Sequence, residues 1–127
     1  MQLVNGIRIF NATPHPITFQ VNNALVIVEP DEMINASIVE SPFVEYSRVP
    51  RTAYRGIEFV TPRFCATEEG IDIINNARRN GADLIVGSII AAQAYPQQVV
   101  AMVPAIGFER VPPAEKRMRA DKFTVYH

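Results

Sequence analysis

The chain of 127 residues holds a single cysteine, Cys65, and this scarcity limits the chemistry available to it. One thiol cannot form an intrachain disulfide or supply a cysteine-rich zinc site, and it is compatible with a reducing compartment. Histidine is nearly as rare, with His15 in a predicted turn and His127 as the last residue. We therefore expect neither a histidine-based metal site nor a Ser-His-Asp triad.

The chain also lacks a large excess of either positive or negative charge, and it lacks long apolar runs. The net charge is −1, so bulk electrostatics give no reason to expect a long nucleic acid or a membrane surface as a partner. No segment approaches the roughly 20 apolar residues that span a bilayer. The first residues also lack the basic start and apolar core of a secretion signal. We expect no association with membranes.

Motifs of catalysis are absent as well. The sequence has neither a Walker-type phosphate loop nor a G-x-G-x-x-G turn. Its carboxylates are scattered, and the densest group, Glu29-Pro30-Asp31-Glu32, falls on a predicted turn without a partner that would orient an acid or a base. These gaps favour binding over catalysis, and they imply no cofactor and no metal.

Alternating apolar residues predict β-structure in the first sixty residues. Strands are expected around Ile7 to Ile9 and over Ile17–Val21 and Ala24–Glu29, with Asn22-Asn23 as a hairpin turn. Further strands are expected from Ile34 to Ile38 and from Phe43 to Tyr46, broken at Ser41-Pro42, and then over Gly56–Val60. Arg48 to Tyr54 is expected to be a polar connection.

The clearest helix is predicted to begin at Thr67 and to end at Asn80. Thr67 is a suitable N-cap, Glu68 and Glu69 occupy the first turn, and Gly81 follows the last. With 48% apolar residues, the chain reads as one α+β domain, residues 1–127, whose mostly antiparallel sheet packs against one or two helices.

A second strand-to-helix turn is predicted at Gly87-Ser88. Leu84 to Val86 is expected to be a buried strand, and Ile89 to Tyr95 a short helix that Ser88 caps and Pro96 closes. Free backbone N–H groups at such a turn attract anions. Ser88 and Ile89 are therefore candidate contacts to a phosphate.

The segment from Phe108 to Lys122 carries a local excess of positive charge. It contains five basic residues against three acidic ones: Arg110, Lys116, Arg117, Arg119 and Lys122 against Glu109, Glu115 and Asp121. Arginine matches phosphate oxygens bidentately, and Phe108 or Tyr95 is placed to stack on a base. The alternative is a solvated loop with pairs such as Glu115 and Arg119.

His15 lies in the stiff segment N-A-T-P-H-P-I, where two prolines restrict the backbone. Two interpretations remain open. His15 is a ligand contact or a general base, or else Thr13 and His15 are local hydrogen-bonding residues that stabilise a turn between two strands.

Three segments of the sequence resemble a known group of phage proteins. N-A-T-P-H-P-I-T-F, V-E-P-D and D-L-I-V-G-S-I-I-A-A-Q-A look like small phage-encoded proteins that begin N-L-T-P-H, among them the Thoeris anti-defence sponges. The resemblance covers the first thirty residues and Asp83 to Ala94. The chain departs from the pattern by V-E-P-D in place of P-S-G, by the helix from Thr67 to Asn80, and by its R-M-R-A-D-K segment.

This resemblance implies a non-enzymatic sponge in the cytoplasm of an infected bacterial host. Such a protein sequesters cyclic ADP-ribose isomers or small cyclic oligonucleotides, and we expect it to be a homo-oligomer. The expected ligand-binding residues are Ser88, Ile89, Tyr95, Phe108, Arg110, Arg117, Arg119 and His15. A phage structural or protein-interaction protein is the alternative, and a phosphoesterase with His15 as acid or base is a third hypothesis.

Overall fold

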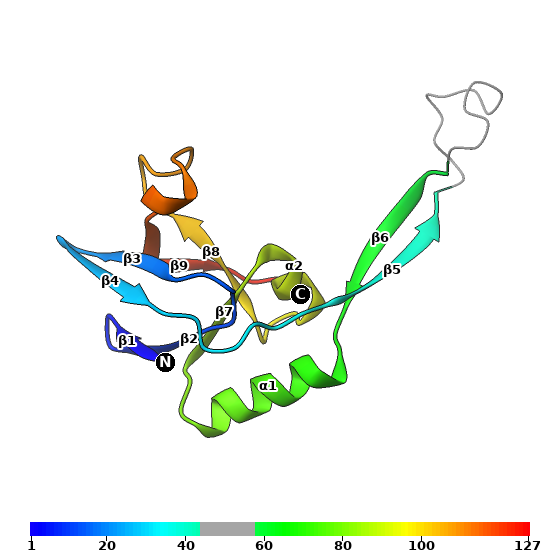
Figure 1. Cartoon of the computed structure of the whole chain (residues 1–127), viewed down its shortest axis with the longest axis horizontal. Coiled ribbons are helices and arrows are strands. Elements are labelled where there is room, and N and C mark those ends of the chain that lie inside the picture. The colour runs from blue at the N-terminus through cyan, green and yellow to red at the C-terminus, as the bar shows by residue number, and fades with distance from the viewer. Residues whose placement is uncertain (44–57) are drawn as a thin grey trace.

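A seven-stranded mixed sheet forms the body of the protein in a computed structural model that describes residues 1–43 and 58–127 (Figure 1). In sheet order its strands are β1 (Gln2–Val4), β2 (Ile7–Asn11), β7 (Leu84–Gly87), β8 (Val100–Pro104), β9 (Met118–Thr124), β3 (Ile17–Val21) and β4 (Ala24–Val28). Together with a separate hairpin of β5 (Ser37–Pro42) and β6 (Val60–Cys65), four of the seven described strand pairings are antiparallel and three are parallel. The predicted fold class, a single α+β domain, is confirmed.

Both faces of the central strands are buried, and successive side chains point to opposite faces. Ile9 and Val86 point into a cluster enclosed by the curved sheet, whereas their neighbours Phe10 and Ile85 point into a second cluster that holds the helices. Because β7 is covered on both faces, its apolar residues are continuous rather than alternating with polar ones. Val4 of one edge strand and Val28 of the other share the enclosed cluster, so the sheet curves like a barrel.

The two helices form where local capping chemistry predicts them. Thr67 accepts a hydrogen bond from the Gly70 backbone N–H and caps α1 (Glu68–Arg79), and Gly81 follows with φ of +94°. Ser88 accepts from the Ala91 N–H and caps α2 (Ile89–Ala94). Both predicted N-caps are confirmed.

The region around the β5–β6 hairpin differs from the prediction in three places. β5 includes Ser41 and ends at Pro42 rather than breaking before them, because the hairpin has only two strands and a proline on an edge loses no ladder hydrogen bond. The strand expected to end at Val60 instead begins there. Ile34 belongs to no strand; its N–H donates to the Ala12 carbonyl and its side chain is buried. Val44, Tyr46, the connection 48–54 and the start of the strand expected over Gly56–Val60 lie outside the described residues.

The apolar segment from Val99 to Val103 lies inside the sheet. β8 pairs with β7 on one side and β9 on the other, and Val100 and Ala101 are buried. Because β8 is paired on both sides within its own chain, its hydrophobicity gives no reason to expect a homo-oligomer, and the homo-oligomer stays a prediction.

Candidate functional site

A buried asparagine organises the turn that carries His15. Asn11 is fully buried, and its side-chain amide donates to the carbonyls of His15, at 2.8 Å, and Val28, at 2.9 Å. Its oxygen accepts from the backbone N–H and from the hydroxyl of Thr13, at 2.9 and 2.7 Å. All four hydrogen-bonding positions of the amide are therefore occupied, which is what a buried polar group requires.

The local hydrogen-bonding interpretation of Thr13 and His15 is confirmed for the backbone of His15. The Thr13 hydroxyl lies 2.9 Å from the His15 carbonyl, and the His15 N–H donates to the same hydroxyl over 3.4 Å. The imidazole is exposed and makes no hydrogen bond with the residues that the structure describes. The turn thus uses the backbone of His15 and leaves its ring free to meet a ligand.

A cavity of about 630 Å³ opens beside this turn, and we call it the His15 cavity. It joins three segments far apart in sequence: the T-P-H-P turn with the start of β3, Ser88 at the N-terminus of α2, and the chain around the 3₁₀ turn Pro113–Glu115. Lys116 is the one lysine or arginine in its lining. The full lining is Thr13, Pro14, His15, Pro16, Ile17, Thr18, Ser88, Met102, Pro113, Ala114, Lys116 and Met118.

A neighbouring cavity of about 500 Å³, the Phe108 cavity, contains two further predicted residues. The guanidinium carbon of Arg117 lies 4.6 Å from the centroid of the Phe108 ring, within the range of a cation–π contact. Leu25 and Ile27 of β4 and Val111 supply apolar lining. Phe108 and Arg117 are therefore brought together, but beside the His15 cavity rather than inside it.

Tyr95 is not available for stacking, which corrects the prediction. Its side chain is 2% exposed, and its hydroxyl accepts from the Thr67 N–H at 2.9 Å and donates to the Asn35 carbonyl at 2.8 Å. The sequence placed Tyr95 at the end of a short helix but did not show which side of that helix faces the core. Tyr95 is a structural residue that joins α2 to the start of α1.

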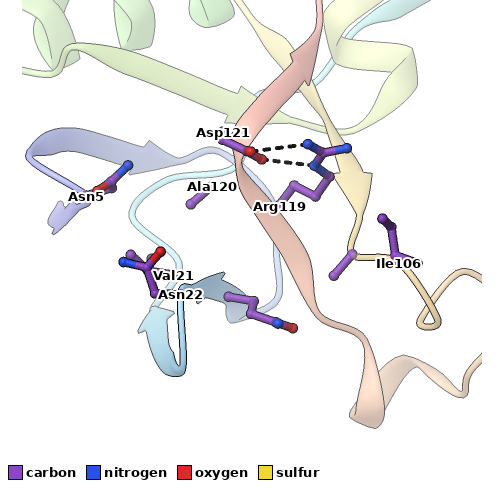
Figure 2. Close-up of a pocket in the computed structure, with 9 residues that line it drawn as sticks. Asn5, Val21, Asn22, Ile106, Arg119, Ala120 and Asp121 are labelled. Carbon is purple, nitrogen blue, oxygen red and sulfur yellow. Dashed lines mark hydrogen bonds and ion pairs between the residues drawn. The ribbon is translucent and has the colours of Figure 1, made fainter.

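The three predicted arginines do not converge on one site. Figure 2 shows Arg119 turned toward Asp121, to which its Nε and Nη2 donate at 2.9 and 3.1 Å, in a third cavity of about 350 Å³. The hydrogen bond from Arg119 lowers the pKa of Asp121 and, in return, raises the pKa of the guanidinium. Arg110 is exposed and lines neither the His15 cavity nor the Phe108 cavity.

Ile89 is exposed at the N-terminus of α2, next to Ser88 in the lining of the His15 cavity. Its role toward a phosphate stays a prediction.

Sequence reasoning missed the residues that shape these cavities from the sheet. Met102 and Met118 line the His15 cavity from the adjacent strands β8 and β9. Asn11 was also missed, although the sequence contains a signal for its role. It ends a strand and precedes a proline-containing turn, and at such a position an Asn side chain commonly accepts a hydrogen bond from the backbone N–H two residues later.

Among the described residues there is no group of His, Cys, Asp and Glu that could hold a metal ion, and no helix there is long and apolar enough to cross a membrane. Comparisons with protein-family models, with curated proteins and with solved structures find no match to this chain.

Proposed function

We propose that this protein binds a small phosphate-bearing nucleotide in the His15 cavity and holds it without conversion. Such a protein would act as a phage sponge for cyclic nucleotide-type immune signals, either cyclic ADP-ribose isomers or small cyclic oligonucleotides. One observation carries the proposal: His15, Ser88 and Lys116, from three separate segments, line the same ligand-sized cavity.

The chemistry of the lining supports such a ligand. Lys116 supplies a positive charge, and the Ser88 hydroxyl and His15 ring add hydrogen-bonding groups for phosphate oxygens. Three prolines and two methionines supply apolar contact area for a base or a ribose: Pro14, Pro16, Pro113, Met102 and Met118. An anionic head and a less polar body are the two parts of a nucleotide.

Calorimetry with cyclic diadenosine monophosphate and a cyclic ADP-ribose isomer tests the proposal. Replacing Lys116 by Met keeps the apolar stem but removes the charge, and it should weaken binding by about 10- to 100-fold, the range expected for a charge-assisted contact. Lys122→Met is the matched control, because Lys122 is exposed on β9 and lines neither cavity. Equal binding by both variants would contradict the proposal, as would a parent protein that binds neither nucleotide.

A specific observation also favours the alternative, a phage structural or protein-interaction protein. The β5–β6 hairpin projects from the body of the protein, and all six residues of β5 are exposed (Figure 1). Ile38 is 60% and Val39 is 44% exposed on opposite faces of the strand. An apolar arm of this kind is suited to a protein partner or to a second copy of the chain.

Light scattering of the parent and of the double variant Ile38→Ser, Val39→Ser tests this alternative. An arm used in self-assembly predicts an oligomer for the parent and a 14.2 kDa monomer for the variant. A monomeric parent at micromolar concentration would contradict the expected homo-oligomer and leave the ligand-binding proposal intact.

A further inference from the structure

The His15 cavity and the Phe108 cavity are adjacent and share part of their walls. Thr18, Ala114 and Lys116 line both of them. Lys116 thus lies at the boundary, and its ammonium group, which donates one hydrogen bond to the Glu109 carbonyl at 2.8 Å, has two further N–H donors for a ligand that extends to either side. The Phe108 cavity therefore adjoins the proposed nucleotide site directly.

The lining of the Phe108 cavity is suited to a planar ring. Phe108 carries the guanidinium of Arg117 over its ring, and a guanidinium plane is itself a stacking surface for a nucleobase. Leu25 and Ile27, 48% and 56% exposed on the outer face of β4, line the same cavity. A planar aromatic ring suits this lining, because such a ring stacks on a guanidinium and also packs against apolar side chains.

Hydrogen bonds hold the segment that carries these groups in place before any ligand binds. The Ala105 N–H donates to the Arg117 carbonyl at 2.8 Å, which closes the loop at its base. The Phe108 N–H donates to the Ala105 carbonyl at 3.0 Å, and Lys116 Nζ donates to the Glu109 carbonyl at 2.8 Å. A loop that is already ordered loses less conformational entropy when it binds.

We infer that the two cavities are subsites of one site, and that the ligand class is a dinucleotide with two bases joined through phosphate. This inference rests on the proposed function. One base lies in the Phe108 cavity beside Phe108 and Arg117, and phosphate meets Lys116 at the boundary. The second base lies in the His15 cavity, where the thioethers of Met102 and Met118 offer favourable contacts to an aromatic ring.

The experiment compares a one-base probe with a two-base probe. Adenosine monophosphate and cyclic diadenosine monophosphate are titrated by calorimetry into the parent, Phe108→Ala and Ile106→Ala. Ile106 is the matched control, because it lies in the same loop at 86% exposure and lines neither cavity. Ile27→Asp, on an exposed strand position, repeats the test from a second element by adding a negative charge to the cavity.

The inference predicts that the two-base probe binds the parent at least about 10-fold more tightly than the one-base probe. Phe108→Ala should weaken the two-base probe by about 5- to 150-fold, the range that stacking one base on an aromatic side chain supplies. Ile27→Asp should weaken it as well, and Ile106→Ala should bind as the parent does.

Two results separate failure of the inference from failure of the proposed function. If both probes bind with dependence on Lys116 but Phe108→Ala and Ile27→Asp bind as the parent does, the Phe108 cavity is no subsite and the inference is overturned alone. If neither probe binds the parent, the proposed function fails and the inference fails with it.

Discussion

Gly70 in α1 lies directly against the hydroxyl of Tyr95, so closely that a Cβ on Gly70 would fall 1.8 Å from that oxygen and 2.4 Å from the Cζ atom. The same hydroxyl accepts from the Thr67 N–H at the N-terminus of α1 and donates to the Asn35 carbonyl. Tyr95 therefore ties the end of α2 to the start of α1 and to the segment before β5. The glycine is needed for this contact, and not for an unusual backbone angle.

Gly70→Ala should destabilise the protein, although alanine normally stabilises a helix interior by up to about 1 kcal/mol relative to glycine. The methyl group cannot fit unless Tyr95 or α1 moves, and overpacking of this kind costs about 1–3 kcal/mol. Thermal unfolding followed by circular dichroism measures the loss. Asn75→Ala, at an exposed position of the same helix, is the control and should unfold at or above the parent temperature. Equal melting of Gly70→Ala and the parent would contradict this packing.

Tyr95→Phe should lower stability without changing nucleotide affinity. The substitution keeps the ring but leaves the Thr67 N–H and the Asn35 carbonyl without their partner, at a cost of about 1–3 kcal/mol. Denaturant unfolding gives the stability, and calorimetry gives the affinity of a correctly folded sample. A variant that folds as the parent does but loses nucleotide binding would return Tyr95 to the ligand site.

Features fixed by short-range chemistry were predictable from the sequence. Thr67, Ser88 and Gly81 act within one helical turn of themselves, so capping rules found both helices. Alternation likewise predicted β3, and the Asn22-Asn23 turn predicted β4 as its hairpin partner, with which β3 pairs across those two residues. These elements need no knowledge of the rest of the chain.

The remainder depends on pairings between distant segments. β3 pairs in parallel with β9, from Phe19 to Met118 and from Gln20 to Arg119, and no local pattern specifies that register. The register decides which basic residues share a cavity, so the sequence could not separate Arg117 beside Phe108 from Arg119 beside Asp121. The sequence did identify the His15 turn and Ser88. It could not show that Lys116 lies between these residues and Phe108, because that placement also depends on the pairing of distant strands.

Asn11→Ala should be among the most damaging single substitutions. It removes four hydrogen bonds in a fully buried position and leaves several backbone groups without a partner. Each such group costs about 1 kcal/mol or more, so a loss of at least about 3 kcal/mol is expected. Asn23→Ala, at an exposed hairpin turn, is the control. Chemical denaturation that gives similar values for both variants would contradict the central role of Asn11 in the turn.

Asp121 should titrate below the usual range for an aspartate while its partner is present. The hydrogen bond from Arg119 lowers the pKa of the carboxyl, so the pair favours the folded state at pH above the ordinary aspartate value. That contribution is lost as the pH falls through the lowered pKa, and exposure to solvent keeps it small. Carboxyl carbon shifts measured by NMR against pH should show the low midpoint in the parent and a return toward the ordinary value in Arg119→Ala. An unchanged midpoint would contradict the pairing.

His15→Ala separates a sponge from a phosphoesterase. The His15 carbonyl and N–H hold the turn, and any residue other than proline retains both, so the variant should fold normally. If the protein only stores its ligand, cyclic diadenosine monophosphate incubated with the parent should be recovered intact after heat denaturation. The variant should give the same recovery with at most about a 10-fold weaker affinity, since it loses one contact. Mass spectrometry of the released nucleotide decides the matter. A linear or cleaved product formed by the parent but not by His15→Ala would make the imidazole an acid or base in hydrolysis and would replace the sponge by an enzyme.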